Sequence, residues 1–191
     1  KLDMRSGTER LAYALIIVTV ATMTAWILAM LLGLKPIAFL PLDLALWQWI
    51  LLRMLFSFCG VLGFSIMFNS PVRLATAAGL IGAVSNTLRL ELIDLYAIPP
   101  AAAAFIGAFL AGILASTLKG VAGYPRISLT VPSIVIMVPG LYLYKGFYNL
   151  GIMELATAAS WLASALLIIL ALPLGLIFAR IATDKTFRYC T

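Results

Sequence analysis

Two prolines interrupt a long apolar stretch, residues 126–145, and each would free polar backbone groups there. Proline has no N–H, and in a helix its ring clashes with the carbonyl four residues earlier. If the stretch is helical, Pro132 and Pro139 therefore leave the carbonyls of Ser128 and Val135 without their usual partners. Inside a bilayer, only neighbouring protein or a water-filled cavity can satisfy such carbonyls. Broken membrane helices of this kind often lie at the binding sites of transporters.

The groups around this interruption suit a small molecule that carries a carboxylate. Amides after Gly140 could turn the positive end of a helix toward the carboxylate, and the freed carbonyls could meet an ammonium group or a cation. That combination suits a zwitterionic amino acid, whereas a dicarboxylate would use the amides and a nearby cation. Tyr144 lies four residues after Gly140 and offers a hydroxyl, and Lys145 could neutralise an acid or extend to the membrane surface.

These groups define a candidate substrate site, and the alternative is a kinked helix that serves packing alone, since membrane helices tolerate proline. An earlier run adds Asn86, which lies beside Ser85 and Thr87. Buried polar side chains of this kind also form hydrogen bonds between helices. The predicted substrate-binding residues are Ser128, Pro132, Ser133, Val135, Pro139, Gly140, Tyr144, Lys145 and Asn86.

Few charged side chains fall within the apolar runs. Arg53 and Arg89 could bind an acid in a transport path, but each lies near the end of a run. We therefore expect both side chains to extend to the membrane surface. Glu91, Asp94 and Glu154 could take part in proton coupling, but we expect them to be exposed at loop edges. No carboxylate is placed mid-membrane, so the sequence indicates no proton site.

Several kinds of chemistry are excluded. The chain has no histidine, so no His-based metal site, proton relay or Ser-His-Asp triad can form within it. It contains no nucleotide-binding loop, and no mid-membrane pair of acids or Ser-Lys pair can be placed. We therefore expect no enzyme activity, catalytic residue, metal ion or cofactor.

The composition is that of an integral membrane protein. Of the 191 residues, 64% are hydrophobic and 10% are charged, whereas soluble domains contain about a quarter charged residues. The net charge of +6 would suggest nucleic acid as a partner in a soluble protein. Here it reports orientation, because basic residues gather in cytoplasmic loops. The expected partners are the lipid bilayer and a small-molecule substrate, and no nucleic acid.

Six apolar runs are long enough to cross a bilayer. The sequence thus predicts an all-α, polytopic membrane bundle of about six transmembrane helices, of which the fifth is broken by proline and glycine. The runs are 11–33, 46–68, 72–90, 101–118, 127–148 and 157–179. In the third and fourth runs, small residues recur every four positions, a spacing that lets membrane helices approach closely.

The basic residues separate into two groups under this topology. Nine lie on the side of the termini and four at or near the opposite ends of the spans. The nine are Lys1, Arg5, Arg10, Arg73, Lys119, Arg126, Arg180, Lys185 and Arg188, and the four are Lys35, Arg53, Arg89 and Lys145. Because basic residues favour the cytoplasmic side, both termini are predicted to be cytoplasmic.

The turn between the second and third runs contains three candidates for a gating or structural role, Asn69, Pro71 and Arg73. Asn69 or Ser70 can cap the next helix, and Pro71 suits its first turn. A capped helix start with a cytoplasmic arginine explains these residues without a substrate.

Two motifs resemble a known family. Residues 63–73 read Gly-Phe-Ser-Ile-Met-Phe-Asn-Ser-Pro-Val-Arg, which is similar to the G-F-x-x-x-F-N-x-P-x-R turn of the threonine/serine exporter (ThrE) family. Residues 130–140 read Thr-Val-Pro-Ser-Ile-Val-Ile-Met-Val-Pro-Gly, which is similar to that family's broken helix. The resemblance covers residues 46–191 and is to the smaller, C-terminal half of the family, with about five helices. Residues 1–45, a helix and a connector, are either an added helix or the last helix of the larger half.

The resemblance implies a membrane subunit or half of a secondary exporter in the bacterial inner membrane. Its expected partner is a larger membrane half, separate or fused, within a homo- or hetero-oligomer. Threonine and serine are the first expected substrates, and succinate-like dicarboxylates are the alternative. Export would be driven by an ion gradient, with protons as the expected ion, through alternating access. A non-transporting structural subunit is the remaining alternative.

Overall fold

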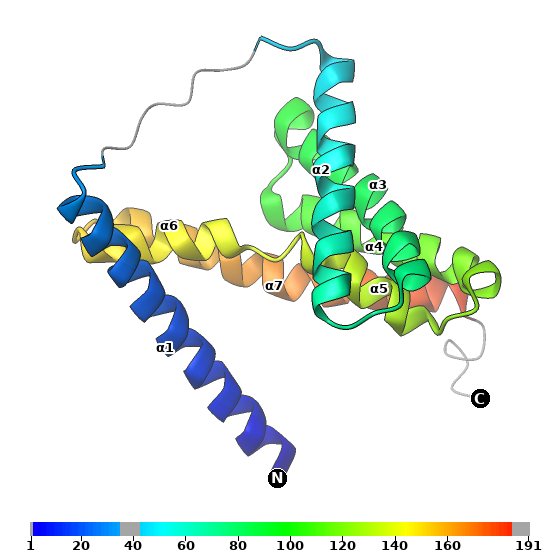
Figure 1. The fold of residues 1–191 in the computed structure, drawn as a ribbon, viewed down its shortest axis with the longest axis horizontal. Coiled ribbons are helices and arrows are strands. Elements are labelled where there is room, and N and C mark those ends of the chain that lie inside the picture. The colour runs from blue at the N-terminus through cyan, green and yellow to red at the C-terminus, as the bar shows by residue number, and fades with distance from the viewer. Residues whose placement is uncertain (1, 35–42, 185–191) are drawn as a thin grey trace. The chain divides into compact units, whose positions relative to one another are not determined.

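The computed structural model describes residues 2–34 and 43–184, which form seven helices and no strand (Figure 1). The helices are α1 (Leu2–Leu31), α2 (Leu46–Met67), α3 (Val72–Tyr96), α4 (Pro100–Ala122), α5 (Arg126–Val135), α6 (Gly140–Gly151) and α7 (Leu155–Thr183). The predicted all-α fold and the broken fifth helix, now α5 and α6, are confirmed. Lys1, Lys35, Lys185 and Arg188, which entered the charge count, lie outside the described residues.

Five stretches of the described chain are long and apolar enough to cross a membrane, which confirms a helical membrane protein. They are Gly7–Leu31, Leu46–Met67, Pro100–Gly120, Arg126–Gly151 and Leu155–Thr183. The stretch Arg126–Gly151 joins α5 and α6. The predicted third span, α3, is not among the five, because small, polar and charged residues lower its hydropathy. The crossing by α3 stays a prediction.

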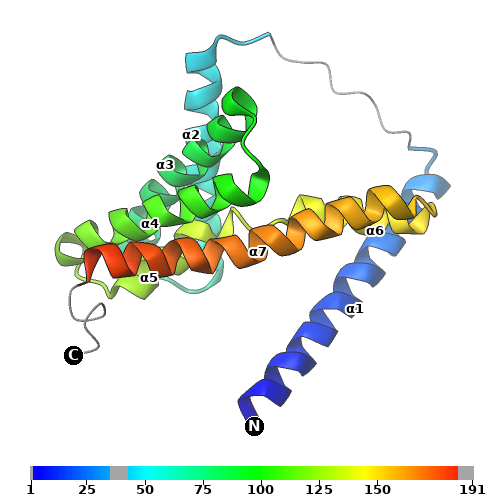
Figure 2. The same cartoon turned by 180° about the vertical axis from the view of Figure 1, so that it is seen from behind.

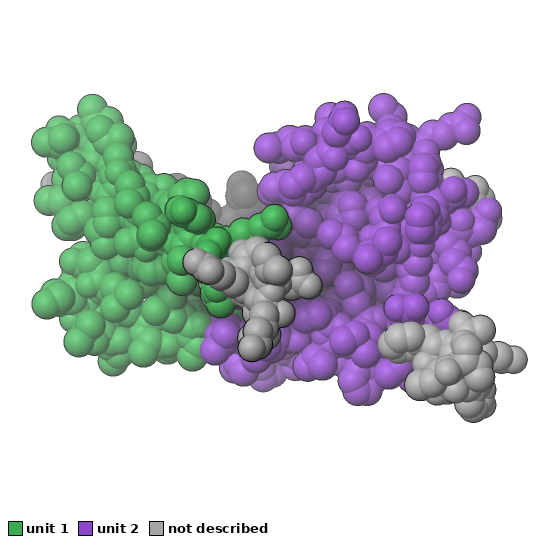
Figure 3. All heavy atoms as spheres, turned by 90° about the horizontal axis from the view of Figure 1, so that it is seen from below, with its two compact units in different colours: residues 1–42, 140–165 green, residues 43–139, 166–191 purple. Residues whose placement is uncertain are grey.

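The chain divides into two compact units (Figure 3). Unit 1 contains residues 1–42 and 140–165, and unit 2 contains residues 43–139 and 166–191. The unit boundary at residue 140 falls where α6 begins, and α7 contributes to both units. The predicted division at residue 45, which follows the family resemblance, stays a prediction.

Unit 1 is built from α1, α6 and the first part of α7. α1 packs against α6, and the end of α6 approaches α1 closely, since a Cβ at Gly151 would lie 3.2 Å from the Met23 methyl group. A Cβ at Gly146 would lie 2.6 Å from a methyl group of Leu162. These small residues therefore let α6 contact both of its neighbours in the unit.

Unit 2 is organised around α3, which packs against α2, α4 and α5 (Figures 1 and 2). The predicted small-residue face of α3 is buried. A Cβ at Gly82 would lie 2.6 Å from a methyl group of Val61 and 2.9 Å from the Ser133 carbonyl oxygen, so α2, α3 and α5 meet there. On α7, a Cβ at Gly175 would lie 2.5 Å from the Phe105 carbonyl oxygen, which brings the later part of α7 against α4.

Candidate functional site

The interruption of the predicted fifth helix lies at residues 136–139. α5 continues through Pro132 and ends at Val135. The amide of Met137 then donates to the Ile134 carbonyl at 2.9 Å. α6 begins at Gly140, directly after Pro139. Of the two predicted breaks, only the one at Pro139-Gly140 separates two helices, and α5 continues past Pro132 although proline offers no N–H there.

The prediction that Val135 presents a free carbonyl is wrong. The Val138 amide donates to the Val135 carbonyl at 3.1 Å. A proline four residues ahead removes the normal donor, and the last turn tightens so that the amide three residues ahead replaces it. The usual donor to the Ser128 carbonyl would be the amide four residues ahead, and that residue is Pro132, which has no N–H.

The interruption instead presents the carbonyl of Met137, which lies outside the helical ladder. Arg89 of α3 donates to this carbonyl through Nη1 at 2.9 Å. A Cβ at Gly107 of α4 would lie 3.2 Å from the Arg89 Cβ and 3.3 Å from the Met137 sulfur, so α4 closes over the pair. The expectation that Arg89 extends to the membrane surface is therefore wrong. A half-buried cation lies at the broken helix.

Asn86 lies one turn before Arg89 on α3 and is buried. Its Nδ2 donates to the Ser57 hydroxyl of α2 at 2.9 Å, which is the interhelical role that the sequence offered as an alternative. Its Oδ1 and the hydroxyl oxygens of Ser85 and Thr87 have no hydrogen-bond partner among the described residues. Buried polar atoms are normally satisfied, so this part of α3 has capacity for a further polar group.

Ser133, Pro132 and Pro139 are buried in unit 2. The Ser133 hydroxyl donates to the Thr130 carbonyl at 2.8 Å. This bond lies within α5 and occupies the hydroxyl proton. Unit 2 thus holds Asn86, Ser128, Pro132, Ser133, Val135 and Pro139.

Gly140, Tyr144 and Lys145 belong to unit 1. Among the described residues outside its own turn, none has an atom within 4 Å of the place that a Cβ at Gly140 would take. The Tyr144 ring stacks on Tyr148, with centroids 6.3 Å apart. The Lys145 ammonium lies 4.4 Å from the centroid of the Trp161 ring, a cation–π contact. Within unit 1, Tyr144 and Lys145 therefore both contact aromatic rings.

A second charged group of unit 2 joins α2 and α3. Arg53 donates through Nη1 to Glu91 at 2.8 Å and through Nη2 to Asp94. Its guanidinium also lies 5.6 Å from the centroid of the Trp49 ring. The prediction that Arg53 and the two acids are separate groups is wrong, because they form ion pairs. Their positions at the same end of two adjacent predicted helices were the signal that could have paired them.

The turn between α2 and α3 differs from its prediction. Asn69 adopts a left-handed conformation with φ 60°. α3 is preceded by Pro71 as its N-cap, with no side-chain capping bond. Asn69 and Ser70 therefore do not cap α3, and the Ser70 amide instead donates to the Ser65 carbonyl at 3.0 Å. Arg73 is exposed, and the gating role of this turn stays a prediction.

Comparison with known proteins adds one match. A family model described as "Threonine/Serine exporter, ThrE" matches residues 53–182, more than half of the chain. The match runs from α2 into the last turn of α7 and contains the Arg89–Met137 contact. No curated protein and no solved structure matches the chain.

Proposed function

The chain belongs to the threonine/serine exporter (ThrE) family, and on that premise we propose that it forms a membrane half or subunit of a secondary exporter of threonine and serine. The observation that carries the proposal is the Arg89 guanidinium on the Met137 carbonyl, at the interruption between α5 and α6. This pair is the chemical complement of a zwitterion. A substrate carboxylate would take the guanidinium and the substrate ammonium would take the carbonyl.

The side-chain hydroxyl that threonine and serine share has a matching position. Asn86 is three residues before Arg89 and therefore on the same face of α3. Its Oδ1 has no hydrogen-bond partner among the described residues and can accept a hydroxyl proton. A dicarboxylate would find one cation and a carbonyl here, a poorer match because the carbonyl repels a second carboxylate.

The remaining parts of the proposal follow from the family and the charge pattern. The exporter works by alternating access around the broken helix, coupled to protons. The larger membrane half completes the site, and the protein lies in the bacterial inner membrane with both termini cytoplasmic. Ser128 and Pro139 shape the interruption.

Efflux of labelled threonine from proteoliposomes that contain this chain and the larger half tests the proposal. Loss of a charge-assisted hydrogen bond costs about 1.5–3 kcal/mol, so Arg89→Gln should reduce efflux on the order of tenfold to a hundredfold. Arg10→Gln removes an exposed cation of α1 and should leave efflux unchanged.

Three outcomes decide against the assignment. Threonine efflux that is equal in the native chain and Arg89→Gln removes Arg89 from the site. Efflux of labelled succinate in preference to threonine makes the dicarboxylate the substrate. Efflux that does not depend on this chain at all identifies it as a structural subunit.

A further inference from the structure

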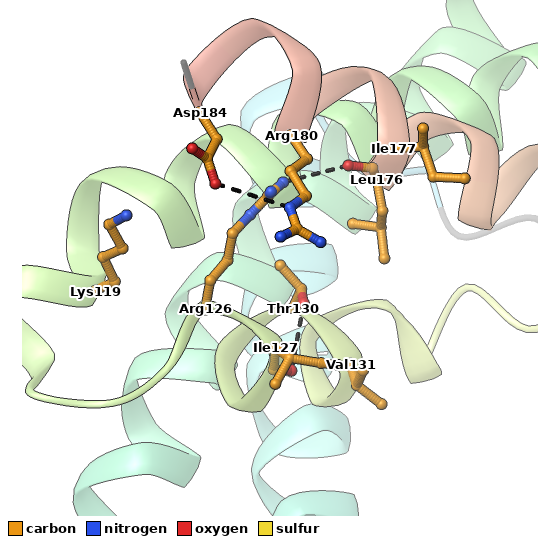
Figure 4. A pocket seen from close by; sticks show the side chains of 9 residues that line it. All are labelled: Lys119, Arg126, Ile127, Thr130, Val131, Leu176, Ile177, Arg180 and Asp184. Atoms are coloured by element: carbon orange, nitrogen blue, oxygen red, sulfur yellow. Dashed lines mark hydrogen bonds and ion pairs between the residues drawn. The ribbon is translucent and has the colours of Figure 1, made fainter. Parts of the chain in front are cut away.

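A basic cavity lies at the opposite end of α5 from the interruption. It has a volume of about 500 Å³ and is formed by the end of α4, the start of α5 and the last turns of α7, all in unit 2 (Figure 4). Lys119, Arg126 and Arg180 line it, with Asp184 as its acid. We propose that this cavity binds the phosphate of an anionic phospholipid headgroup.

The guanidinium of Arg126 is held in place at the cavity wall. Its Nη2 donates to the Leu176 carbonyl of α7 at 3.2 Å (Figure 4). A Cβ at Gly112 of α4 would lie 3.0 Å from this nitrogen and 2.5 Å from the Cβ of Ala179. Glycine therefore provides the room in which α4, α7 and the guanidinium meet. Nε of Arg126 is buried and has no hydrogen-bond partner among the described residues, and a planar guanidinium suits the oxygens of a phosphate.

The charges of the cavity favour an anion. Three basic side chains face one acid, and Arg180 forms an ion pair with that acid, since its Nε lies 3.8 Å from an oxygen of Asp184. The cavity therefore keeps an excess of positive charge. Lys119 is exposed at the end of α4, with no ion pair among the residues that the structure describes. The first turn of α5 adds the positive end of a helix beside Arg126.

The depth of the cavity matches a headgroup. Three of the apolar stretches end there, Pro100–Gly120 and Leu155–Thr183 with their last turns and Arg126–Gly151 with its first residue. The basic side chains are thus placed where the hydrocarbon core gives way to the headgroup layer. Basic pockets between membrane helices at this depth bind anionic lipids.

The apolar wall favours a lipid over a free anion. Ile127 and Val131, one turn apart on α5, are 69% and 50% exposed. On α7, Ile177 continues an exposed apolar row with Leu174 and Leu170 at helical spacing. Ile127, Val131 and Ile177 line the cavity themselves, so an acyl chain would find an apolar surface beside the basic group. A free phosphate or a small carboxylate gains nothing from such a wall.

Native mass spectrometry of the full chain in detergent tests this site. Phosphatidylglycerol and phosphatidylcholine with identical acyl chains are added separately, and phosphatidylglycerol should bind more tightly. One basic residue near a charged lipid surface contributes on the order of a fivefold change in binding, so Lys119→Gln and Arg126→Gln should each weaken phosphatidylglycerol binding by about that factor. Phosphatidylcholine binding should not change.

Arg73→Gln is the matched control, because Arg73 is an exposed cation on the same predicted side of the membrane and does not line the cavity. Equal affinity for the two lipids, or equal weakening by Arg73→Gln, would overturn the proposal. Displacement of phosphatidylglycerol by glycerol 3-phosphate would also overturn it, in favour of a free phosphate.

If Arg126→Gln does not fold, Lys119→Gln still tests the proposal, since the lysine is exposed. The measurement needs no transport. Its failure is therefore separate from failure of the proposed exporter function.

Discussion

The hydrogen-bond acceptors near each arginine decide where its guanidinium lies in this protein. Arg53 and Arg89 both lie near the ends of apolar runs, and each has an acceptor on another part of the chain. Arg53 binds Glu91 and Asp94, and Arg89 binds the Met137 carbonyl. An arginine at the centre of a bilayer costs about 2.5–3.5 kcal/mol on insertion scales, and a nearby acceptor relieves this cost without exposure. The two arginines differ in these partners, since Arg53 donates to two carboxylates and Arg89 donates to a backbone carbonyl.

The two acids beside Arg53 should contribute unequally to stability. The Glu91 side chain is 13% exposed and that of Asp94 is 51% exposed. Glu91→Gln should therefore lower the free energy of unfolding by about 1–3 kcal/mol, whereas Asp94→Asn should lower it by less than about 1 kcal/mol.

Thermal unfolding of the two variants in the same detergent measures this difference. Equal losses of stability would mean that solvent screening does not separate the two ion pairs. A double variant with Arg53→Met should recover part of the loss from Glu91→Gln, because it removes a cation that has lost one of its two carboxylates.

Helices of unit 2 meet at glycines, and their closest approach is at α3. Gly82 faces both Val61 and the Ser133 carbonyl, so α2 and α5 touch α3 at the same level. Ser133 lies beside Pro132 in α5, a few residues before the interruption. The packing at Gly82 therefore holds the helix that leads into the candidate site.

A methyl group at Gly82 should disturb this junction. In Gly82→Ala, the new Cβ would lie 2.6 Å from the Val61 methyl group and 2.9 Å from a backbone oxygen. Overpacking of this kind costs about 1–3 kcal/mol, so the unfolding temperature should fall. Gly63→Ala on α2 is the matched control, since no described residue outside its own helical turn has an atom within 4 Å of its Cβ position. It should be neutral or stabilising by up to about 1 kcal/mol, because alanine is the better helix former. Equal effects of the two substitutions would show that α3 does not pack closely at Gly82.

Across the whole chain, the number of membrane crossings depends on α3. Five stretches qualify as spans by length and hydropathy, and α3 would be the sixth. If α3 crosses, the turn before it and the residues after it lie on opposite sides, and both termini lie on one side. The cluster of Arg53, Glu91 and Asp94 is then at the outer end of α2 and α3.

Cysteine labelling in intact cells measures this topology. In a chain with Cys59→Ser and Cys190→Ser, an impermeant maleimide should label Ala97→Cys, which is exposed just after α3. Arg73→Cys, exposed at the start of α3, should react only after the membrane is permeabilised. Labelling of both positions from the same side would contradict the six-span topology and the cytoplasmic assignment of the termini.

Local chemistry made much of the fold and part of the site predictable. Helix ends followed from proline and glycine, as at Pro99-Pro100, where α4 begins, and at Pro139-Gly140, where the fifth helix divides. Burial of the small residues of α3 followed from their spacing. A missing backbone donor or a small side chain affects the helix within a few residues of its position. The sequence alone therefore determines these local features.

Contacts between distant residues were decided only by the tertiary structure. Arg53 and Glu91 are 38 positions apart, Arg89 and Met137 are 48 apart, and Arg126 and Leu176 are 50 apart. The sequence located the interruption of the fifth helix but assigned the free carbonyl to Val135 rather than Met137, and it placed Arg89 at the surface. Which carbonyl a guanidinium meets depends on how α3, α4 and α5 pack, and that packing is set by close approaches such as those at Gly82 and Gly107.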